Sequence, residues 1–221
     1  MVRRDEADGS LSASRCSSPA GHADAKGFVL IIGAPRAGPR NTGRAYVYTT
    51  LTTTPAFIIE SDETGAALGA MFVAVAGDVN RDSAQDVYAS DFANRAKGPS
   101  TGRIYVHSGA DGSRLLTLTG EGPGEGFGTS ASTAGDLDGD GHADLAATSG
   151  GRIYVYSGKD GRLLRTITSR IPGDTLRFDS VGIGDVDGDG TEDLLVTSAY
   201  SGINGYRSGR VFLLSSGVKG G

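Results

Sequence analysis

The stretch GRIYVHSG at residues 102–109 returns almost unchanged as GRIYVYSG at residues 151–158. Shorter variants are GRAYVY at residues 43–48 and GRVFLL at residues 209–214. All four share an arginine, at Arg44, Arg103, Arg152 and Arg210, so that successive copies are 59, 49 and 58 residues apart. Self-similarity with a period of this size indicates the blades of a propeller or the coils of a solenoid.

Each copy lies within a run of short expected strands. In the third copy we expect strands at residues 128–134, 145–148, 152–156 and 163–168, with Asp160-Gly161 as a hairpin turn signal between the last two. The second copy repeats this turn at Asp111-Gly112, before a strand at 115–119. Four strands per repeat favour an antiparallel propeller blade over a β-helix coil. The alternative is a β-sandwich of hairpins, which does not usually repeat a motif strand for strand.

Composition and charge argue against several classes of protein. The chain has 36 glycines among 221 residues, which indicates many tight turns. A net charge of -5 argues against a nucleic-acid partner. No apolar run is long enough for a transmembrane helix, so we expect no membrane insertion. The N-terminus has no apolar core of a signal peptide, and the single cysteine, Cys16, excludes an internal disulfide framework.

Two nine-residue loops, 136–144 and 185–193, carry aspartate at positions 1, 3, 5 and 9 and glycine at position 6, where a sharp reversal is needed. Position 7 would offer a backbone carbonyl, from His142 in one loop and Thr191 in the other, and we expect the His142 imidazole to point to solvent. The carboxylate ligands predicted in the two loops are Asp136, Asp138, Asp140, Asp144, Asp185, Asp187, Asp189 and Asp193.

An oxygen-only ligand set favours Ca²⁺ over zinc or copper, and magnesium usually keeps several waters. The sequence therefore predicts two calcium sites. Metal-free surface turns are the alternative, which the twofold recurrence of the spacing disfavours. An EF-hand is excluded because position 12 is Ala147 in one loop and Val196 in the other, where that motif needs glutamate.

A third loop, residues 78–86, departs from this pattern. Its predicted ligands are Asp78, Asn80, Asp82 and Asp86 with the backbone carbonyl of Ala84. Ser83 replaces the glycine of position 6, and the guanidinium of Arg81 opposes a cation. A third calcium site is therefore possible but stays open. A fourth, decayed copy ends in GHAD at residues 21–24 and lacks carboxylates at positions 1, 3 and 5, so no metal is expected there.

These residues resemble the FG-GAP repeat family. Phe127-Gly128 precedes an Asp-rich loop and a strand, and a Gly-Ala-Pro turn is intact at residues 33–35. In the later repeats we assign this turn to residues 89–91, 148–150 and 197–199. The resemblance implies the β-propeller of integrin α subunits and of many bacterial surface proteins, with calcium between the first and second strands of a blade.

The expected domain organisation is an irregular segment at residues 1–27, FG-GAP propeller repeats at 28–217 and a tail at 218–221. The all-β repeats fall at about 28–68, 69–127, 128–180 and 181–217, giving about four four-stranded antiparallel blades. The first lacks a clear first strand and the last lacks a clear fourth. Integrin-type propellers have seven blades, so this chain forms either a small closed ring or, as we favour, an open arc of a larger propeller.

Three functions compete. The favoured one is a calcium-stabilised binding or adhesion module with a protein or glycan ligand, outside the cell or at its surface. The second is the propeller part of a polysaccharide lyase or another carbohydrate- or lipid-active enzyme. Against it stand the three histidines, which occupy strand or loop-copy positions, and the absence of a Gly-x-Ser-x-Gly elbow. The third is a structural fragment without a partner.

Overall fold

The computed structural model describes residues 29–63, 67–169, 171, 176 and 180–215. These residues form four antiparallel sheets and one short 3₁₀ turn, η1 (Pro39–Asn41), so the all-β prediction is confirmed. No helix in this part of the chain is long and apolar enough to cross a membrane. The expected segments at 1–27 and 218–221, with the decayed loop, lie outside the described residues.

The sheets follow one another in chain order, and each is a blade. The first contains β1 (Leu30–Ala34), β2 (Arg44–Tyr48) and β3 (Phe57–Glu60). The second contains β4 (Val73–Gly77), β5 (Asp86–Asp91), β6 (Arg103–His107) and β7 (Arg114–Thr119). The third contains β8 (Ala131–Gly135), β9 (Asp144–Ser149), β10 (Arg152–Tyr156) and β11 (Leu163–Ile167). The fourth contains β12 (Ser180–Gly182), β13 (Leu194–Ser198) and β14 (Arg210–Leu214).

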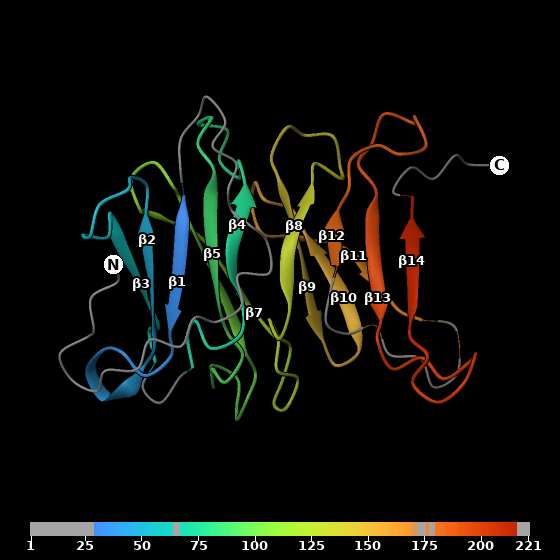
Figure 1. Cartoon of the computed structure of the whole chain (residues 1–221), viewed down its shortest axis with the longest axis horizontal. Coiled ribbons are helices and arrows are strands. Elements are labelled where there is room, and N and C mark those ends of the chain that lie inside the picture. The colour runs from blue at the N-terminus through green and yellow to red at the C-terminus, as the bar shows by residue number, and fades with distance from the viewer. Residues whose placement is uncertain (1–28, 64–66, 170, 172–175, 177–179, 216–221) are drawn as a thin grey trace.

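Strands of one blade pair with their sequence neighbours, as short hairpin connections require. The first strands β4, β8 and β12 lie side by side, and β1 lies beside β4. Within the described residues the first blade has no strand equivalent to β4, and the last has none equivalent to β7. The first and last blades stand at opposite ends of the molecule's longest axis (Figure 1). The described blades thus form an open arc and not a closed four-bladed ring.

The core consists of three apolar layers, one between each pair of consecutive blades. The period of two along a strand produces them, because alternate side chains point to opposite faces. In β6, Ile104 and Val106 pack with residues of the third blade, while Tyr105 packs with residues of the first. We call the face toward the following blade the forward face and the other the rear face.

The strand registers align the blades residue by residue. In every blade the repeated arginine pairs with the last residue of the preceding strand: Arg44, Arg103, Arg152 and Arg210. The turn after the second strand is therefore at residues 90–92 in the second blade, one residue later than the sequence assignment of 89–91. The pairing partner of Arg103 is Asp91, where Arg44 pairs with Ala34.

Candidate metal centre

Three Asp-rich loops lie along one edge of the arc. Each connects the first strand of a blade to the second: β4 to β5, β8 to β9, and β12 to β13. Because these strands run in the same directions in every blade, the loops emerge at the same edge, the upper one in Figure 1. The connections from second to third strand, such as residues 92–102 and 199–209, emerge at the opposite edge.

The carboxylate at position 1 closes each loop by accepting hydrogen bonds from the backbone N–H groups of positions 5 and 6. Asp136 accepts from Asp140 N at 3.0 Å and from Gly141 N at 2.8 Å. The corresponding distances are 3.0 and 2.9 Å for Asp78, and 3.1 and 2.9 Å for Asp185. The same pair of backbone donors therefore holds the position-1 side chain in all three loops.

The carboxylate at position 9 is fully buried in every loop, at Asp86, Asp144 and Asp193. One of its oxygens accepts the N–H of position 2, at 2.7, 2.9 and 2.9 Å respectively. In the first two loops the other oxygen accepts the N–H of Gly109 or Gly158, at 3.0 Å in both cases. This residue therefore joins the loop to the end of the third strand.

Burial alters the proton affinity of Asp144 and Asp86. Loss of water raises the pKa of Asp144 to about 6, against the opposing effect of its two backbone donors, and nearby Asp138 and Asp136 add to the rise. Burial likewise raises the pKa of Asp86. A divalent cation beside such a group would favour its ionised form.

Positions 4 and 6 take the left-handed backbone conformation in all three loops. The φ angles are 74° and 85° at Gly139 and Gly141, and 74° and 92° at the corresponding glycines of loop 185–193. In loop 78–86, Arg81 and Ser83 adopt φ of 63° and 70°. The strain expected at Ser83 is therefore present, and the sequence reasoning missed the same strain at Arg81.

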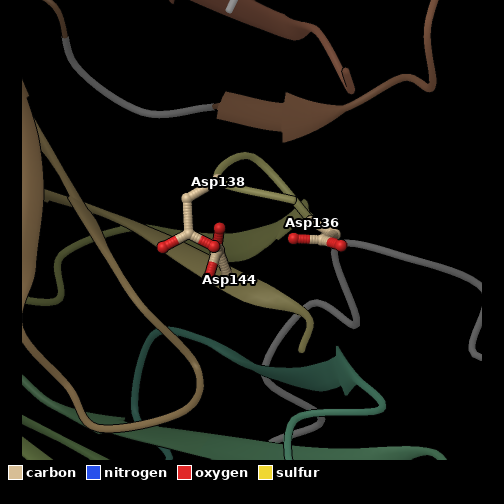
Figure 2. A group of neighbouring side chains, drawn as sticks. All are labelled: Asp136, Asp138 and Asp144. Atoms are coloured by element: carbon tan, nitrogen blue, oxygen red, sulfur yellow. The ribbon is translucent and has the colours of Figure 1, made fainter. Parts of the chain in front are cut away.

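Two of the loops bring three carboxylates together. Asp136, Asp138 and Asp144 form one group, and Asp185, Asp187 and Asp193 form the other; within each, one oxygen per residue lies within 4.8 Å of the others. The three side chains of the first group converge in Figure 2. Calcium–oxygen distances of about 2.3–2.6 Å place ligands on opposite sides of the ion roughly 5 Å apart. Each of the two groups could therefore hold a metal ion.

The remaining predicted ligands are placed differently. Asp140 and Asp189 at position 5 belong to neither group and accept the backbone N–H of position 7, at 3.0 and 2.9 Å. In loop 78–86, Asn80 offers a single carbonyl oxygen, and its amide donates to Asp82 at 2.9 Å. In Ala84 the backbone N–H donates to Asp82 at 2.7 Å. This loop thus lacks the third carboxylate that the other two bring to their centre.

Side chains from the end of the third strand and the hairpin after it also reach the loops, which the sequence reasoning missed. Arg162 lies 2.6 Å from Asp138, and Lys159 lies 3.7 Å from Asp140. In the second and fourth blades a serine makes the corresponding contact. The Ser108 hydroxyl donates a hydrogen bond to Asp82 at 3.3 Å, and the Ser215 hydroxyl donates one to Asp187 at 2.8 Å. The hairpin turns at Asp111-Gly112 and Asp160-Gly161 bring these side chains to the same edge, which could have suggested the contact.

The His142 imidazole does not point to solvent, contrary to expectation. Its Nδ1 lies 2.6 Å from the carbonyl oxygen of Val79, in the loop of the preceding blade. The next residue, Ala143, donates its N–H to the Asp78 carbonyl at 3.0 Å, and the Arg81 guanidinium lies against Gly141. Neighbouring blades stack at this edge, so a loop side chain has the adjacent loop as its nearest surface. The loops of blades two and three are therefore in direct contact.

Two overlapping stretches, residues 78–147 and 136–196, match the sequence profile of the FG-GAP-like repeat. Together they cover more than half of the chain. The chain belongs to the FG-GAP-like repeat family. No curated protein sequence matches it. Each FG-GAP match begins at the first aspartate of a loop and ends in the second strand of the next blade, within β9 or β13. Each match thus spans the contact between two neighbouring blades of this chain.

The register also shows which residue of the first blade is equivalent to position 9 of the FG-GAP loops. Leu30, Val87, Leu145 and Leu194 occupy equivalent positions, because they pair with Tyr48, His107, Tyr156 and Leu214. The residue before each is position 9 of the loop, and in the first blade it is Val29. The first blade therefore has no buried carboxylate at this place.

Proposed function

We propose that this FG-GAP chain is a calcium-binding propeller module for binding or adhesion outside the cell or at its surface. The observation that carries the proposal is the convergence of three carboxylates in each of two loops with equivalent backbone geometry. When bound, Ca²⁺ would neutralise these carboxylates and stabilise the blade edge by linkage. Sites of this kind in extracellular modules bind at roughly 10⁻⁴ to 10⁻³ M, which favours the calcium concentrations found outside cells.

Thermal unfolding with millimolar calcium and with a chelator tests this proposal. Calcium is expected to raise the melting temperature and magnesium to do much less, because magnesium prefers a smaller site with retained waters. The double variant Asp138→Ala, Asp187→Ala should lose most of the response. The variant Asp160→Ala, a turn aspartate outside both groups, is the matched control and should keep it. Equal melting temperatures with calcium and with chelator would contradict the proposed calcium-binding module and favour a metal-free repeat scaffold.

The partner would contact the edge opposite the metal loops, through the connection between β13 and β14. Tyr206 is 90% exposed and Tyr200 is 45% exposed. The Arg207 guanidinium stands over both rings, 5.1 Å from the Tyr200 centroid and 5.3 Å from that of Tyr206. Exposed tyrosine and arginine side chains are enriched where proteins bind partners, and aromatic faces also stack on sugars. This supports a protein or glycan ligand at residues 199–209.

Binding to immobilised polysaccharides and to extracellular-matrix proteins, in calcium, tests this surface. The variant Tyr206→Ala should lose binding to whichever of these ligands the unaltered chain binds, with no change in melting temperature. Leu51→Ala, an equally exposed side chain at the other end of the arc, is the control. Unchanged binding by Tyr206→Ala would move the contact surface elsewhere on the module.

FG-GAP repeats typically form non-enzymatic modules. The described histidines support a structural role in this chain. His107 is buried, its Nδ1 lies 2.9 Å from the Gly112 carbonyl, and its ring stacks on Phe57. His142 bonds the Val79 carbonyl in the same way. We therefore propose a binding module and not the lyase alternative.

A further inference from the structure

The two ends of the arc carry faces that every interior blade buries. In interior blades the forward face of the third strand is sealed, with Ile104 and Val106 at 0% exposure and Ile153 and Val155 at 0% and 1%. In the last blade the register places Val211 and Leu213 at these positions, and they are 63% and 57% exposed.

The forward face of the last blade is a continuous apolar row. Leu195 pairs with Val181 on one side and with Leu213 on the other, so the three side chains line up across β12, β13 and β14. Thr197 pairs with Val211 beside them. An exposed apolar patch of this kind marks an interaction surface.

The first blade shows the complementary rear face. Ile32, Tyr46 and Ile58 pair across β1, β2 and β3, and Leu30 pairs with Tyr48 beside them. Residues at the equivalent places in other blades, such as Ala89, Tyr105 and Tyr154, are buried against the preceding blade. In the first blade these side chains are only half-buried, and Ile58 is 39% exposed.

We propose that the forward face of the last blade docks on the rear face of the first blade of a second copy of this chain. The three interior interfaces show what kind of surface covers a forward face. In each of them, the forward face of one blade is covered by the rear face of the next blade. Only the first blade, in the described residues, offers such a rear face uncovered by a neighbouring blade.

Two such contacts close a ring. A head-to-tail interface generates a closed ring if its rotation closes and a filament if it does not. Two copies of four blades supply eight, which is within the range of about four to eight blades seen in propellers. The ring would be a dimer with twofold symmetry about its central channel. None of the residues named for the two end faces is a predicted calcium ligand.

Light scattering after size exclusion, in calcium and across a concentration series, tests the ring. The expected mass is twice the 22.5 kDa of one chain. The forward variant Val211→Asp, Leu213→Asp should be monomeric, and so should the rear variant Ile58→Asp, Tyr48→Asp. An equimolar mixture of the two variants should form a dimer, because one intact forward face and one intact rear face remain.

The control Leu163→Asp changes an exposed leucine of β11 that belongs to neither end face, and should leave the dimer intact. Circular dichroism and melting temperature show whether each variant keeps its fold. A monomeric unaltered chain, an open polymer, or a dimer that persists in either variant alone would each overturn the proposal. A mixture that stays monomeric while both variants remain folded would overturn it as well.

Discussion

Loops 78–86 and 136–144 have the same backbone course but different side chains. Both close through a position-1 carboxylate, both bury a position-9 aspartate, and both turn through positive φ at positions 4 and 6. Yet one has Asn80, Arg81 and Ser83 where the other has Asp138, Gly139 and Gly141. The carboxylates that cap backbone N–H groups therefore set the loop shape, and the position-3 side chain sets whether three carboxylates converge.

The largest expected effect comes from position 9. In the presence of a chelator, Asp86→Ala and Asp144→Ala should each lower the free energy of unfolding by about 2–5 kcal/mol, because each removes the acceptor of at least two backbone N–H groups. Denaturant titration measures the loss. Asp86→Asn, which keeps one acceptor oxygen, should lose less. If both alanine variants lost under about 0.5 kcal/mol, the buried aspartate would not be what shapes the loop.

Acid should weaken calcium binding at loop 136–144. The pKa of Asp144 is raised to about 6, so this carboxyl holds a proton below that pH in the metal-free fold, and the proton must leave before calcium binds. In the variant Asp187→Ala, which leaves this site as the complete one, the dissociation constant should rise roughly tenfold between pH 7 and pH 5. Calorimetric titration measures it. An affinity independent of pH over this range would exclude Asp144 as a ligand.

Loop 78–86 should become a calcium site when its position 3 is changed. In the background Asp138→Ala, Asp187→Ala, the variant Asn80→Asp should bind one further calcium ion, with a stabilisation of about 1.4 kcal/mol at ten times the dissociation constant. The stoichiometry of binding and the calcium-dependent melting temperature check this. Asn80→Ser, which adds no carboxylate, is the control. No gain by Asn80→Asp would mean that Arg81 alone keeps cations away.

The smallest expected effect is the release of backbone strain. Ser83→Gly should stabilise the fold by about 0.5–1 kcal/mol, since glycine adopts the observed φ of 70° without the penalty of a Cβ. This figure is the net gain after the entropy that glycine adds to the unfolded chain is subtracted. The reciprocal change Gly141→Ser should destabilise by a similar amount and must also displace the Arg81 guanidinium, 3.2 Å from the new Cβ. Two variants that shift stability in the same direction would contradict this account.

Much of the fold could be predicted from the repeats, because strand pattern and turn residues are local properties. The strands expected in the third copy at 145–148 and 152–156 lie within β9 and β10 of the structure. The first strand was expected from residue 128 and begins at Ala131, because Gly128 has a φ of 82° that a strand does not adopt.

The candidate site was predicted less completely. The aspartates and their spacing were evident, since one loop of nine residues contains them all. The contacts of His142 with Val79 and of Arg162 with Asp138 were not, because each joins residues from separate elements. The equivalence of Val29 with Asp86 has the same origin, because only strand pairing shows it.

The sequence by itself determined that this protein is a series of FG-GAP β-blades with acidic loops, since each repeat carries its own strand pattern, turns and carboxylates. The tertiary structure decided which aspartates are buried, which join into groups of three, and which apolar faces remain at the ends of the arc. Burial and convergence depend on how neighbouring blades stack. Equivalent residues such as Val106 and Leu213 are of the same type in sequence, and only the presence of a following blade makes one buried and the other exposed.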